Sequence, residues 1–344
     1  MTGGRHGGAA WLALLAASWV PQAAVVADGL AWLAAPQLRR GDTIAFVAPA
    51  GVAAERDVLA YRDVLQREGY RVQIAPGMFA RRQRYLAGSD AERADELNRA
   101  IRDPQVRAIL AVRGGYGLSR ILDRIDYDAL RSDPKIVGGY SDLTALHLAI
   151  ARRTRMISFH CPMPAEWGRD PEGRAFASRS FAATVLRPQT AVPFAVGMPP
   201  GARPRTLTPG CHEGRLLGGN LSLICATLGT PFAIEPEGAI LFIEDVDEKP
   251  YRVDRMLAHL RLAGVLESVG GVIVGQFTID DPDERREIAG VVSEYLAPLG
   301  CPVLTDFPVG HVADNVTLPH GARVRLDADR GTLEILEPVL DGPR

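Results

Sequence analysis

KIVGGYSDLTALHL, residues 135–148, joins an apolar run to a helix-like run through a turn that begins with glycine. A serine on a sharp turn between a buried strand and a helix has its hydroxyl lifted out of the sheet, beside backbone amides that can face a developing oxyanion. Ser141 stands at this place in the turn Gly139-Tyr140-Ser141-Asp142. The nucleophile-elbow pattern G-x-S-x-G is half met, because Leu143 stands where the second glycine would be. The segment alone leaves two interpretations open, a nucleophile and a Ser-Asp helix cap.

The chain around this stretch alternates short apolar runs with amphipathic runs. The expected strands cover 43–48, 71–75, 108–112, 135–138 and 156–159. The expected helices cover 55–68, 90–102, 118–122 and 143–151, and Ser89-x-x-Glu92 forms a capping box at the start of the second. Such alternation predicts a parallel sheet with helices on both faces, and hence an α/β fold.

Glycines and polar residues follow four of the expected strands. In open parallel sheets, ligands gather at the carboxyl ends of the strands. Those ends carry Pro49-Ala50-Gly51, Arg113-Gly114-Gly115-Tyr116-Gly117, Tyr140-Ser141-Asp142 and His160. This convergence favours Ser141 as a site residue. The Gly114-Gly115-x-Gly117 run is a weak dinucleotide signal, because no Gly-Lys-Ser/Thr and no downstream ribose acid accompany it.

The length of 344 residues favours two domains. Between 166 and 210 the periodicity fades, and prolines, glycines and scattered arginines are typical of a linker. We therefore expect a nucleophile-bearing domain at 38–165, a linker at 166–210 and a second α/β domain at 211–340. Within the second domain we expect helices at 221–228 and 251–263, buried strands at 239–243 and 272–274, and a closing hairpin of 324–326 with 333–336.

The composition excludes some classes of partner. The formal net charge is -2, and no dense Lys/Arg stripe with interleaved aromatics is present, so nucleic acid is not expected. A small molecule or a peptide is the more natural substrate. The cysteines are scattered without a C-x-x-C pair, which indicates neither a zinc knuckle nor a redox dithiol; they are Cys161, Cys211, Cys225 and Cys301.

The N-terminus resembles a secretory signal. Arg5 and His6 precede an apolar run from Ala9 to Val20, and Pro21 and small residues follow. The run is shorter than the roughly 20 residues that a membrane span requires. We therefore expect residues 1–27 to be a cleaved leader, with export to the periplasm or cell envelope and no stable membrane span. The alternative is a misassigned start codon upstream of a cytoplasmic enzyme.

Ser141 as a nucleophile needs a general base, and the base needs an orienting carboxylate. His311 lies in a polar, glycine-flanked loop after an apolar run, and loops of this kind carry function more often than helix interiors do. His160, at a strand end, is a second candidate: it either lines the site or is buried beside Cys161-Pro162. Glu244 and Asp245 follow the expected strand 239–243, so either carboxylate could orient the base.

A metal site is the competing interpretation of the acidic stretch that contains Asp247 and Glu248. No ligating histidine lies at helical or hairpin spacing from these residues, which argues against it. We expect neither a metal nor a cofactor.

Six groups of motifs resemble those of the LD-carboxypeptidase family. In chain order they are Pro49-Ala50-Gly51; Arg113-Gly114-Gly115-Tyr116-Gly117; Gly139-Tyr140-Ser141-Asp142-Leu143-Thr144-Ala145; Gly218-Gly219-Asn220-Leu221; Phe242-Ile243-Glu244-Asp245-Val246 with Tyr251-Arg252-Val253-Asp254-Arg255; and Gly310-His311 with Asn315-x-Thr317-Leu318-Pro319-x-Gly321. They keep the family's order over nearly the whole chain after Leu38. The resemblance implies an N-terminal, Rossmann-like parallel-sheet domain, a C-terminal mixed α/β domain, and an active site in the cleft between them.

The resemblance also implies a serine peptidase that removes the terminal D-alanine from the tetrapeptide of peptidoglycan. By motif position, Ser141 is the nucleophile, His311 the general base and Glu244 the orienting carboxylate. Family members are commonly dimers, so a homodimer is expected. His160-Cys161-Pro162 departs from the His-Gly-Pro that relatives often have, and we expect this difference at the wall of the site.

Two further hypotheses concern substrate contacts. The backbone amides of Asp142 and of Gly114 or Gly115 are expected to form the oxyanion hole, because both follow strand ends and glycine lets the backbone approach a substrate closely. Arg113 begins the glycine loop, residues 113–117. It either binds the terminal carboxylate of the substrate or pairs with a neighbouring acid that holds this loop in place.

Two other functions stay open. Relatives that resemble microcin-immunity peptidases keep the triad and cleave aminoacyl-nucleotides, and a loop aromatic that stacks on a nucleobase would favour that version. Trp167 is the candidate aromatic, and packing is its alternative role. A non-catalytic envelope protein that binds muropeptides is the other function, but reactive residue types fill all three triad positions.

Overall fold

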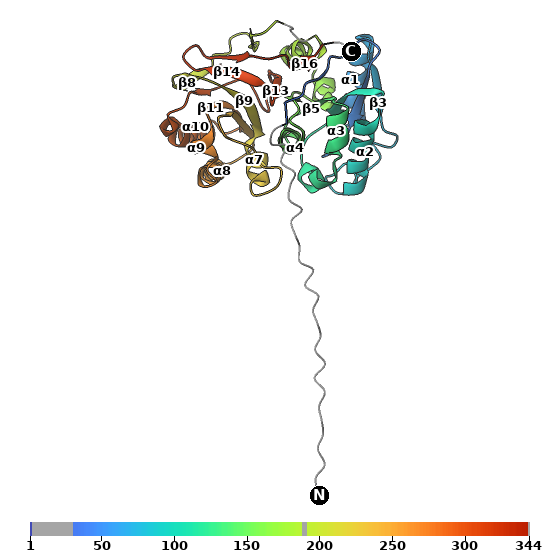
Figure 1. Cartoon of the computed structure of the whole chain (residues 1–344), viewed down its shortest axis with the longest axis horizontal. Helices are drawn as coiled ribbons and strands as arrows, with labels where there is room; N and C mark the ends of the chain where they lie inside the picture. The colour runs from blue at the N-terminus through green and yellow to red at the C-terminus, as the bar shows by residue number, and fades with distance from the viewer. Residues whose placement is uncertain (2–29, 188–190, 343–344) are drawn as a thin grey trace.

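The computed structural model describes Met1 and residues 30–187 and 191–342. This part of the chain forms two α/β halves that lie side by side (Figure 1). The N-terminal half is built on a six-stranded sheet, and the C-terminal half is built on an eight-stranded sheet. The predicted fold, a parallel-sheet half with a mixed α/β half, is confirmed.

The first sheet has the strand order β13-β6-β5-β4-β2-β3. Its parallel strands are β2 (Thr43–Val47), β3 (Arg71–Ile74), β4 (Val106–Ala111), β5 (Ile136–Gly139) and β6 (Ser158–His160). The helices between them are α1 (Glu55–Arg67), α2 (Asp90–Arg102), α3 (Tyr127–Ser132) and α4 (Leu143–Thr154). At the start of α2 both hydrogen bonds of the predicted capping box are present, between Ser89 and Glu92.

Side chains of the first sheet alternate between its two faces, as the two-residue period of a strand requires. On one face Phe46 packs with Val58 of α1. On the other face Ile109 packs with Leu97 of α2 and Leu146 of α4. Both faces are therefore buried, which explains why the strands are almost continuously apolar.

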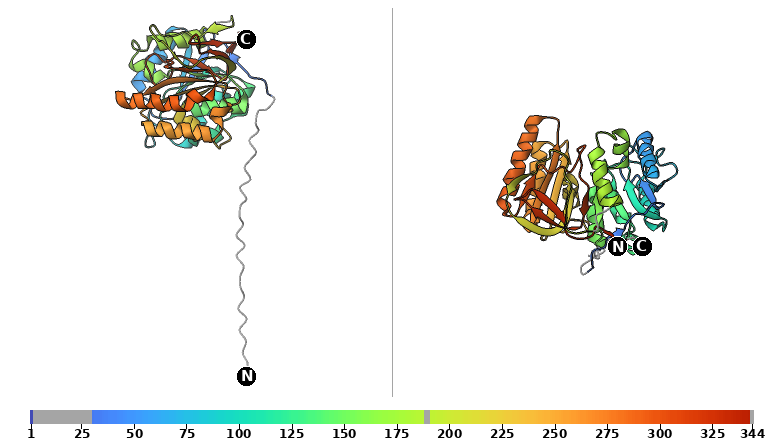
Figure 2. Two further views of the ribbon diagram at one scale, coloured as in Figure 1. Left: turned by 90° about the vertical axis from the view of Figure 1, so that its left-hand side faces the viewer. Right: turned by 90° about the horizontal axis from the view of Figure 1, so that it is seen from above.

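The second sheet has the strand order β7-β15-β14-β9-β10-β11-β12-β8. Its parallel strands are β9 (Cys211–Asn220), β10 (Ile240–Val246), β11 (Gly271–Thr278) and β12 (Val303–Thr305). The flanking antiparallel strands are β7 (Phe194–Ala195), β8 (Arg205–Thr208) and the hairpin of β14 (Arg323–Asp327) with β15 (Thr332–Ile335). The helices α7 (Leu221–Thr227), α8 (Pro250–Leu262), α9 (Val265–Ser268) and α10 (Pro282–Leu296) belong to this half, and α8 and α10 form its outer side (Figure 2).

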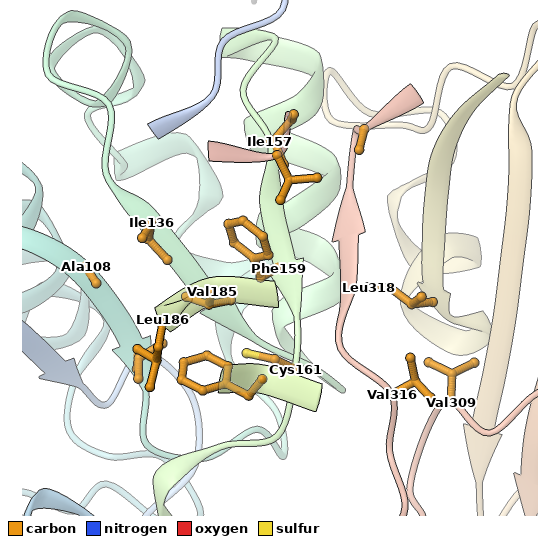
Figure 3. Packing of buried hydrophobic residues seen from close by; sticks show 14 of the residues in the cluster. Ala108, Ile136, Ile157, Phe159, Cys161, Val185, Leu186, Val309, Val316 and Leu318 are labelled. Carbon is orange, nitrogen blue, oxygen red and sulfur yellow. The ribbon is translucent and has the colours of Figure 1, made fainter. Parts of the chain in front are cut away.

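Strand β13 (Leu318–His320) ties the two halves together. It comes from the C-terminal part of the chain but pairs antiparallel with β6 at the edge of the first sheet. Leu318 and Val316 pack in one buried cluster with Ile157 and Phe159 of the first half (Figure 3). The short strands β1 (Ala35–Pro36) and β16 (Leu340–Asp341) also pair, which joins the two ends of the described chain. The halves therefore share a core.

The segment predicted to be a linker, 166–210, is more structured than a linker. It contains most of α5 (Pro164–Arg169), α6 (Ala175–Phe181), a π-helical turn (Ala182–Leu186), and the strands β7 and β8. Trp167 is buried and stacks on Tyr61 of α1, with ring centroids 4.1 Å apart. Apart from Pro171, the prolines of this segment follow Arg187, and apolar residues before that point, including Phe181 and Val185, are buried.

The predicted leader, 1–27, lies outside the described residues apart from Met1. Among the residues that the structure does describe, no helix is both long enough and apolar enough to cross a bilayer.

Candidate active site

Ser141 lies on a strained turn between β5 and α4. Its φ of 64° is in the left-handed region, which non-glycine residues rarely adopt. Gly139, at the end of β5, has a φ of 150°, and a Cβ there would come within 2.8 Å of the Leu143 side chain. Leu143 thus fills the space that lies above Gly139, and it is buried although it occupies the place of the second glycine of the elbow pattern. The turn keeps Ser141 half-buried at the carboxyl edge of the first sheet.

His311 joins Ser141 to Glu244. Its Nε2 lies 3.0 Å from Ser141 Oγ, and its Nδ1 lies 2.7 Å from Glu244 Oε2. The nitrogen beside a carboxylate carries the proton, so Nδ1–H donates to Glu244 and Nε2 is left to accept from the serine hydroxyl. The structure therefore brings together the three residues that the motifs single out, from opposite halves of the molecule.

Glycine at position 310 makes this contact possible. Gly310 has a φ of 119°, and a Cβ at this position would lie 2.8 Å from Glu244 Oε2. The amide of Gly310 donates to the Asn315 side chain at 3.0 Å, which fixes the loop from the other side. The loop can thus place His311 directly over the end of β10, where Glu244 is fully buried.

The charge of the imidazole is set by two opposing effects. Burial lowers the pKa of His311, but the hydrogen bond with Glu244 and its negative charge raise it, and Glu166 adds to this. The pKa of His311 consequently lies above its ordinary value. The environment therefore favours a proton on the imidazole once Ser141 has released one.

The neighbouring carboxylate, Asp245, has a different role. It accepts hydrogen bonds from Asn220 Nδ2 at 2.8 Å and from the backbone and hydroxyl of Ser222 at 2.9 and 2.8 Å. Burial and the charge of Glu244 raise its pKa. Because successive residues of β10 face opposite sides, only Glu244 faces His311, and this resolves which of the two acids contacts the imidazole.

Gly114, one of the residues proposed for the oxyanion hole, packs against the serine. An ideal Cβ on Gly114 would lie 3.1 Å from Ser141 Oγ and 3.4 Å from the Asp142 nitrogen. Within the described residues, the amides of Gly114, Gly115 and Asp142 donate no hydrogen bond. The Asp142 carboxylate turns away and accepts from the Leu118 amide at 2.9 Å, and burial raises the pKa of Asp142 to about 6. Gly114 and Asp142, next to Ser141, thus carry amides that have no hydrogen-bond partner within the described residues.

Arg113 is exposed and donates from Nη1 to the carbonyl of Val52 at 2.7 Å. Among the described residues it forms no ion pair, so the expectation that it pairs with a neighbouring acid does not hold in this structure. The bond links the glycine loop to the loop after β2 and leaves other guanidinium donors exposed. Its binding of a substrate carboxylate stays a hypothesis.

No sequence motif indicated the network that lies behind His311. Tyr140, next to Ser141, donates from its hydroxyl to Glu166 of α5, and its ring centroid lies 4.8 Å from that of His311. Arg174 donates to the carbonyl of Val312 at 3.3 Å and lies 4.0 Å from the Glu166 carboxylate. Glu166, three residues after Met163 and following Pro164, has the position of a helix-capping acid, which is the one local signal that marks it.

The other candidate histidine, His160, does not contact Ser141. It is fully buried with its ring centroid 5.4 Å from that of Tyr140, and burial lowers its pKa well below the ordinary value. The adjacent Cys161 lies in the shared core, where a Cβ on Gly138 would meet its sulfur at 2.9 Å (Figure 3). The expectation that the Cys161 difference bears on the site wall is therefore wrong, because alternation along the strand turns this side chain into the core.

No group of three or more His, Cys, Asp and Glu side chains arranged to hold a metal ion occurs among residues 30–187 and 191–342. The acidic residues near Glu244 instead bind protein donors, as Asp245 does.

A serine, a histidine and a carboxylate joined by hydrogen bonds across two α/β halves form the geometry that a serine hydrolase requires. Comparison with known proteins identifies the family to which the chain belongs. Residues 44–161 match the LD-carboxypeptidase N-terminal domain, and residues 213–326 match the LD-carboxypeptidase C-terminal domain. The chain belongs to the LD-carboxypeptidase family, as its motifs predict, and the expectation of a serine-type carboxypeptidase is confirmed at this level.

Relatives cover nearly the whole chain. A Streptomyces coelicolor protein assigned as a carboxypeptidase is 40% identical over 89% of this chain and 97% of its own length. The probable murein peptide carboxypeptidase of Bacillus subtilis is 36% identical over 89% of this chain and 95% of its own length.

Solved structures of two kinds resemble the fold. The microcin C7 self-immunity protein MccF, in complex with glutamyl sulfamoyl guanosine, has a TM-score of 0.84 at 28% identity and covers 90% of this chain and 100% of its own. The muramoyltetrapeptide carboxypeptidase from Oxalobacter formigenes has a TM-score of 0.72 at 31% identity and covers 88% of this chain and 100% of its own.

Proposed function

We propose that the protein is a serine LD-carboxypeptidase that hydrolyses the terminal D-alanine from peptidoglycan tetrapeptides, with Ser141, His311 and Glu244 as its catalytic triad. The observation that carries the proposal is the unbroken chain of hydrogen bonds from Ser141 through His311 to Glu244, at 3.0 and 2.7 Å. The substrate class is supported by relatives that are named for murein peptides and muramoyltetrapeptide.

The chemistry follows from the geometry. Ser141 Oγ attacks the carbonyl carbon of the bond before D-alanine while its proton passes to His311 Nε2. Glu244 stabilises the imidazolium that results, and the carbonyl oxygen takes up the negative charge. The imidazolium then gives its proton to the amine of the departing D-alanine. Water, deprotonated by His311, hydrolyses the acyl-enzyme and restores Ser141.

The free amides of Gly114, Gly115 and Asp142 are the donors proposed for the oxyanion. Because they are held by the backbone of two rigid turns, they need no reorganisation when the charge develops. Arg113, exposed at the rim, is the proposed partner for the terminal carboxylate of the peptide.

The deciding experiment measures D-alanine release from purified tetrapeptide by the wild type and by Ser141→Ala. Turnover by the wild type, lost in the variant, supports the proposal. A folded wild-type protein that turns over no muropeptide but binds it supports the non-catalytic alternative instead.

The MccF structures favour a second candidate, hydrolysis of aminoacyl-nucleotides, because their TM-score of 0.84 is the higher of the two. The expected stacking residue does not support this candidate, since Trp167 is buried between Tyr61 and Phe181. Assaying glutamyl sulfamoyl guanosine and tetrapeptide side by side distinguishes the two: the enzyme proposed here has the higher kcat/KM on the peptide.

The proposed compartment is the periplasm or cell envelope, reached through cleavage of a leader within residues 1–27, and the proposed assembly is a homodimer. Sequencing the N-terminus of the protein from fractionated cells tests the first. An intact Met1 on a cytoplasmic protein contradicts it. Light scattering of the purified protein tests the second.

A further inference from the structure

Two exposed tyrosines touch each other beside the glycine loop. Tyr85 is 57% exposed and Tyr116 is 45% exposed, and their ring centroids lie 5.8 Å apart with the planes at 62°. Tyr251, another exposed tyrosine, lies beneath arginine side chains instead. Large aromatic surfaces left in water are costly, and in a pair they form a candidate contact surface.

Both rings are presented by tightly fixed loops. Tyr116 stands between Gly115 and Gly117, whose φ angles of 101° and 144° suit glycine alone. Tyr85 is at the tip of a turn closed by reciprocal backbone hydrogen bonds of 3.0 Å between Gln83 and Leu86. Two separate loops thus hold the exposed rings at 62° to each other. We call Tyr85 and Tyr116 together the tyrosine corner.

This corner lies next to the serine. Leu86 bridges to Gly51, and the Gly51 amide donates to the Gly114 carbonyl at 2.9 Å. Gly114 in turn abuts Ser141. Tyr116 is two residues from Gly114, so their Cα atoms lie at most about 7 Å apart. The pair therefore belongs to the rim of the same site.

We propose that Tyr85 and Tyr116 form a subsite for the saccharide ring of a muramoyl-peptide, an inference that rests on the proposed function. Three residues precede the scissile bond of a tetrapeptide, and in extended form they span about 10 Å. A sugar attached beyond them reaches the tyrosine corner while the last peptide bond lies at Ser141.

The chemistry of the corner fits a sugar. A puckered pyranose presents C–H groups to aromatic faces and hydroxyls to phenolic oxygens, and tyrosine offers both. Two rings at 62° cannot both stack on the same flat base, so the pair suits a puckered ring better than a nucleobase. Arg82 and Arg84, exposed on the same turn, form no ion pair within the described residues and add cations beside a substrate that bears carboxylates.

The test compares kcat/KM for D-alanine release from muramoyl-tetrapeptide and from the free tetrapeptide. For Tyr85→Ala and Tyr116→Ala, we expect a loss of about tenfold or more on the muramoyl substrate, mainly in KM, and a change below about twofold on the free peptide. Tyr85→Phe and Tyr116→Phe should retain most of the preference. Tyr251→Ala, which removes a tyrosine that is 61% exposed on helix α8 of the other half, is the matched control.

Three outcomes overturn the inference while leaving the proposed function standing. They are equal losses on both substrates, no loss on either, and a change in molar mass by light scattering, which would mean that a second copy covers the pair. A wild type inactive on both substrates would instead contradict the proposed function. Calorimetric binding of muramoyl-tetrapeptide to Ser141→Ala, with and without Tyr116→Ala, tests the subsite apart from turnover and should show the same tenfold loss.

Discussion

At the scale of single residues, the contact between His311 and Glu244 determines what the site can do. Glu244 is buried, and its Oε2 is the acceptor for the Nδ1 proton of His311. Without a charged acceptor the imidazole can take the other tautomer, in which Nε2 carries the proton and cannot receive one from Ser141.

We therefore expect Glu244→Gln to lower kcat by about 10³- to 10⁴-fold with little change in fold. The measurement is D-alanine release, with circular dichroism as the check on folding. Asp245→Asn, one residue away and bonded to Asn220 and Ser222, is the comparison and should retain most of the rate. A larger loss in Asp245→Asn than in Glu244→Gln would contradict the assignment.

Gly114 gives a second prediction at this scale. An added Cβ would lie 2.9 Å from Ser141 Cβ and 3.1 Å from its hydroxyl, in the space where the carbonyl of the substrate must fit. We expect Gly114→Ala to lower kcat/KM by about 10²-fold or more, the scale of losing one oxyanion donor. Gly197→Ala, where an added Cβ meets nothing within 4 Å, should leave the rate unchanged. Equal activity of both variants would remove Gly114 from the site.

At the scale of elements, α5 and α6 contact the residues around His311, although neither helix belongs to the second sheet. Glu166 of α5 bonds to Tyr140, Arg174 at the start of α6 holds the Val312 carbonyl, and Ser180 of α6 accepts from the Thr317 amide at 3.0 Å. Two of these contacts hold the segment that follows His311, at Val312 and at Thr317. The segment predicted to be a linker is thus part of the support of the site.

The charge of Glu166 should be visible in the pH profile. Its negative charge raises the pKa of His311, and a general base must be unprotonated, so kcat/KM should fall as the pH drops through this raised pKa. Glu166→Gln keeps a hydrogen-bond acceptor for Tyr140 but removes the charge. We expect the acid limb of the profile to move to lower pH, because the pKa of His311 falls when this charge is removed. Glu172→Gln, an exposed acid of the same segment, should not move it. An unchanged limb in Glu166→Gln would show that Glu166 is too well screened to act on His311.

Local sequence signals predicted some elements well and others not at all. The capping box placed α2 at its observed bounds, Asp90–Arg102, and strand periodicity placed β2 and β4 within two residues. Helix α10 was missed although Asp281 and Pro282 at its start are an ordinary start signal. β13 had no local signal, because a three-residue strand is specified by its partner, and that partner, β6, lies more than 150 residues earlier.

The sequence likewise predicted some residues of the candidate site and gave no sign of others. Motif position singled out Ser141, Glu244 and His311, and the structure places them in contact. The Tyr140–Glu166 bond and the tyrosine pair depend on which loops meet in space, and residue type and spacing carry no record of that.

At the scale of the whole molecule, buried imidazoles lie where the two sheets meet. His147 of α4 stacks with His320 of β13 at 5.6 Å, and His160 of β6 lies across Phe242 of β10 at 5.3 Å. His147 also bonds to Ser158 and to the Gly139 carbonyl, both at 2.8 Å, directly before the turn that carries Ser141. The contact between the halves therefore depends on uncharged histidines.

This arrangement predicts that the free energy of unfolding decreases in mild acid. Burial lowers the pKa of His147 to about 4 and that of His320 well below its ordinary value, so the unfolded chain binds more protons than the folded one as the pH falls below about 6.5. Between pH 6.5 and 4, His147 alone would account for roughly 3 kcal/mol. Asp142 opposes this trend, because its pKa is raised to about 6 and the folded chain therefore binds its proton more tightly than the unfolded chain does. Each variant is therefore judged by the change in its unfolding free energy between two pH values.

The measurement is urea unfolding at pH 7 and pH 5. His320→Gln should show a smaller loss of unfolding free energy between the two pH values than the wild type does, because one buried imidazole no longer has to take up a proton. His259→Gln, at an exposed position on α8, should match the wild type, and Asp142 contributes equally to all three proteins. An equal loss of unfolding free energy in His320→Gln and in the wild type between pH 7 and pH 5 would contradict this prediction. It would mean that His320 is not buried in its neutral form, and that the two sheets pack less tightly at this position than the described contacts imply.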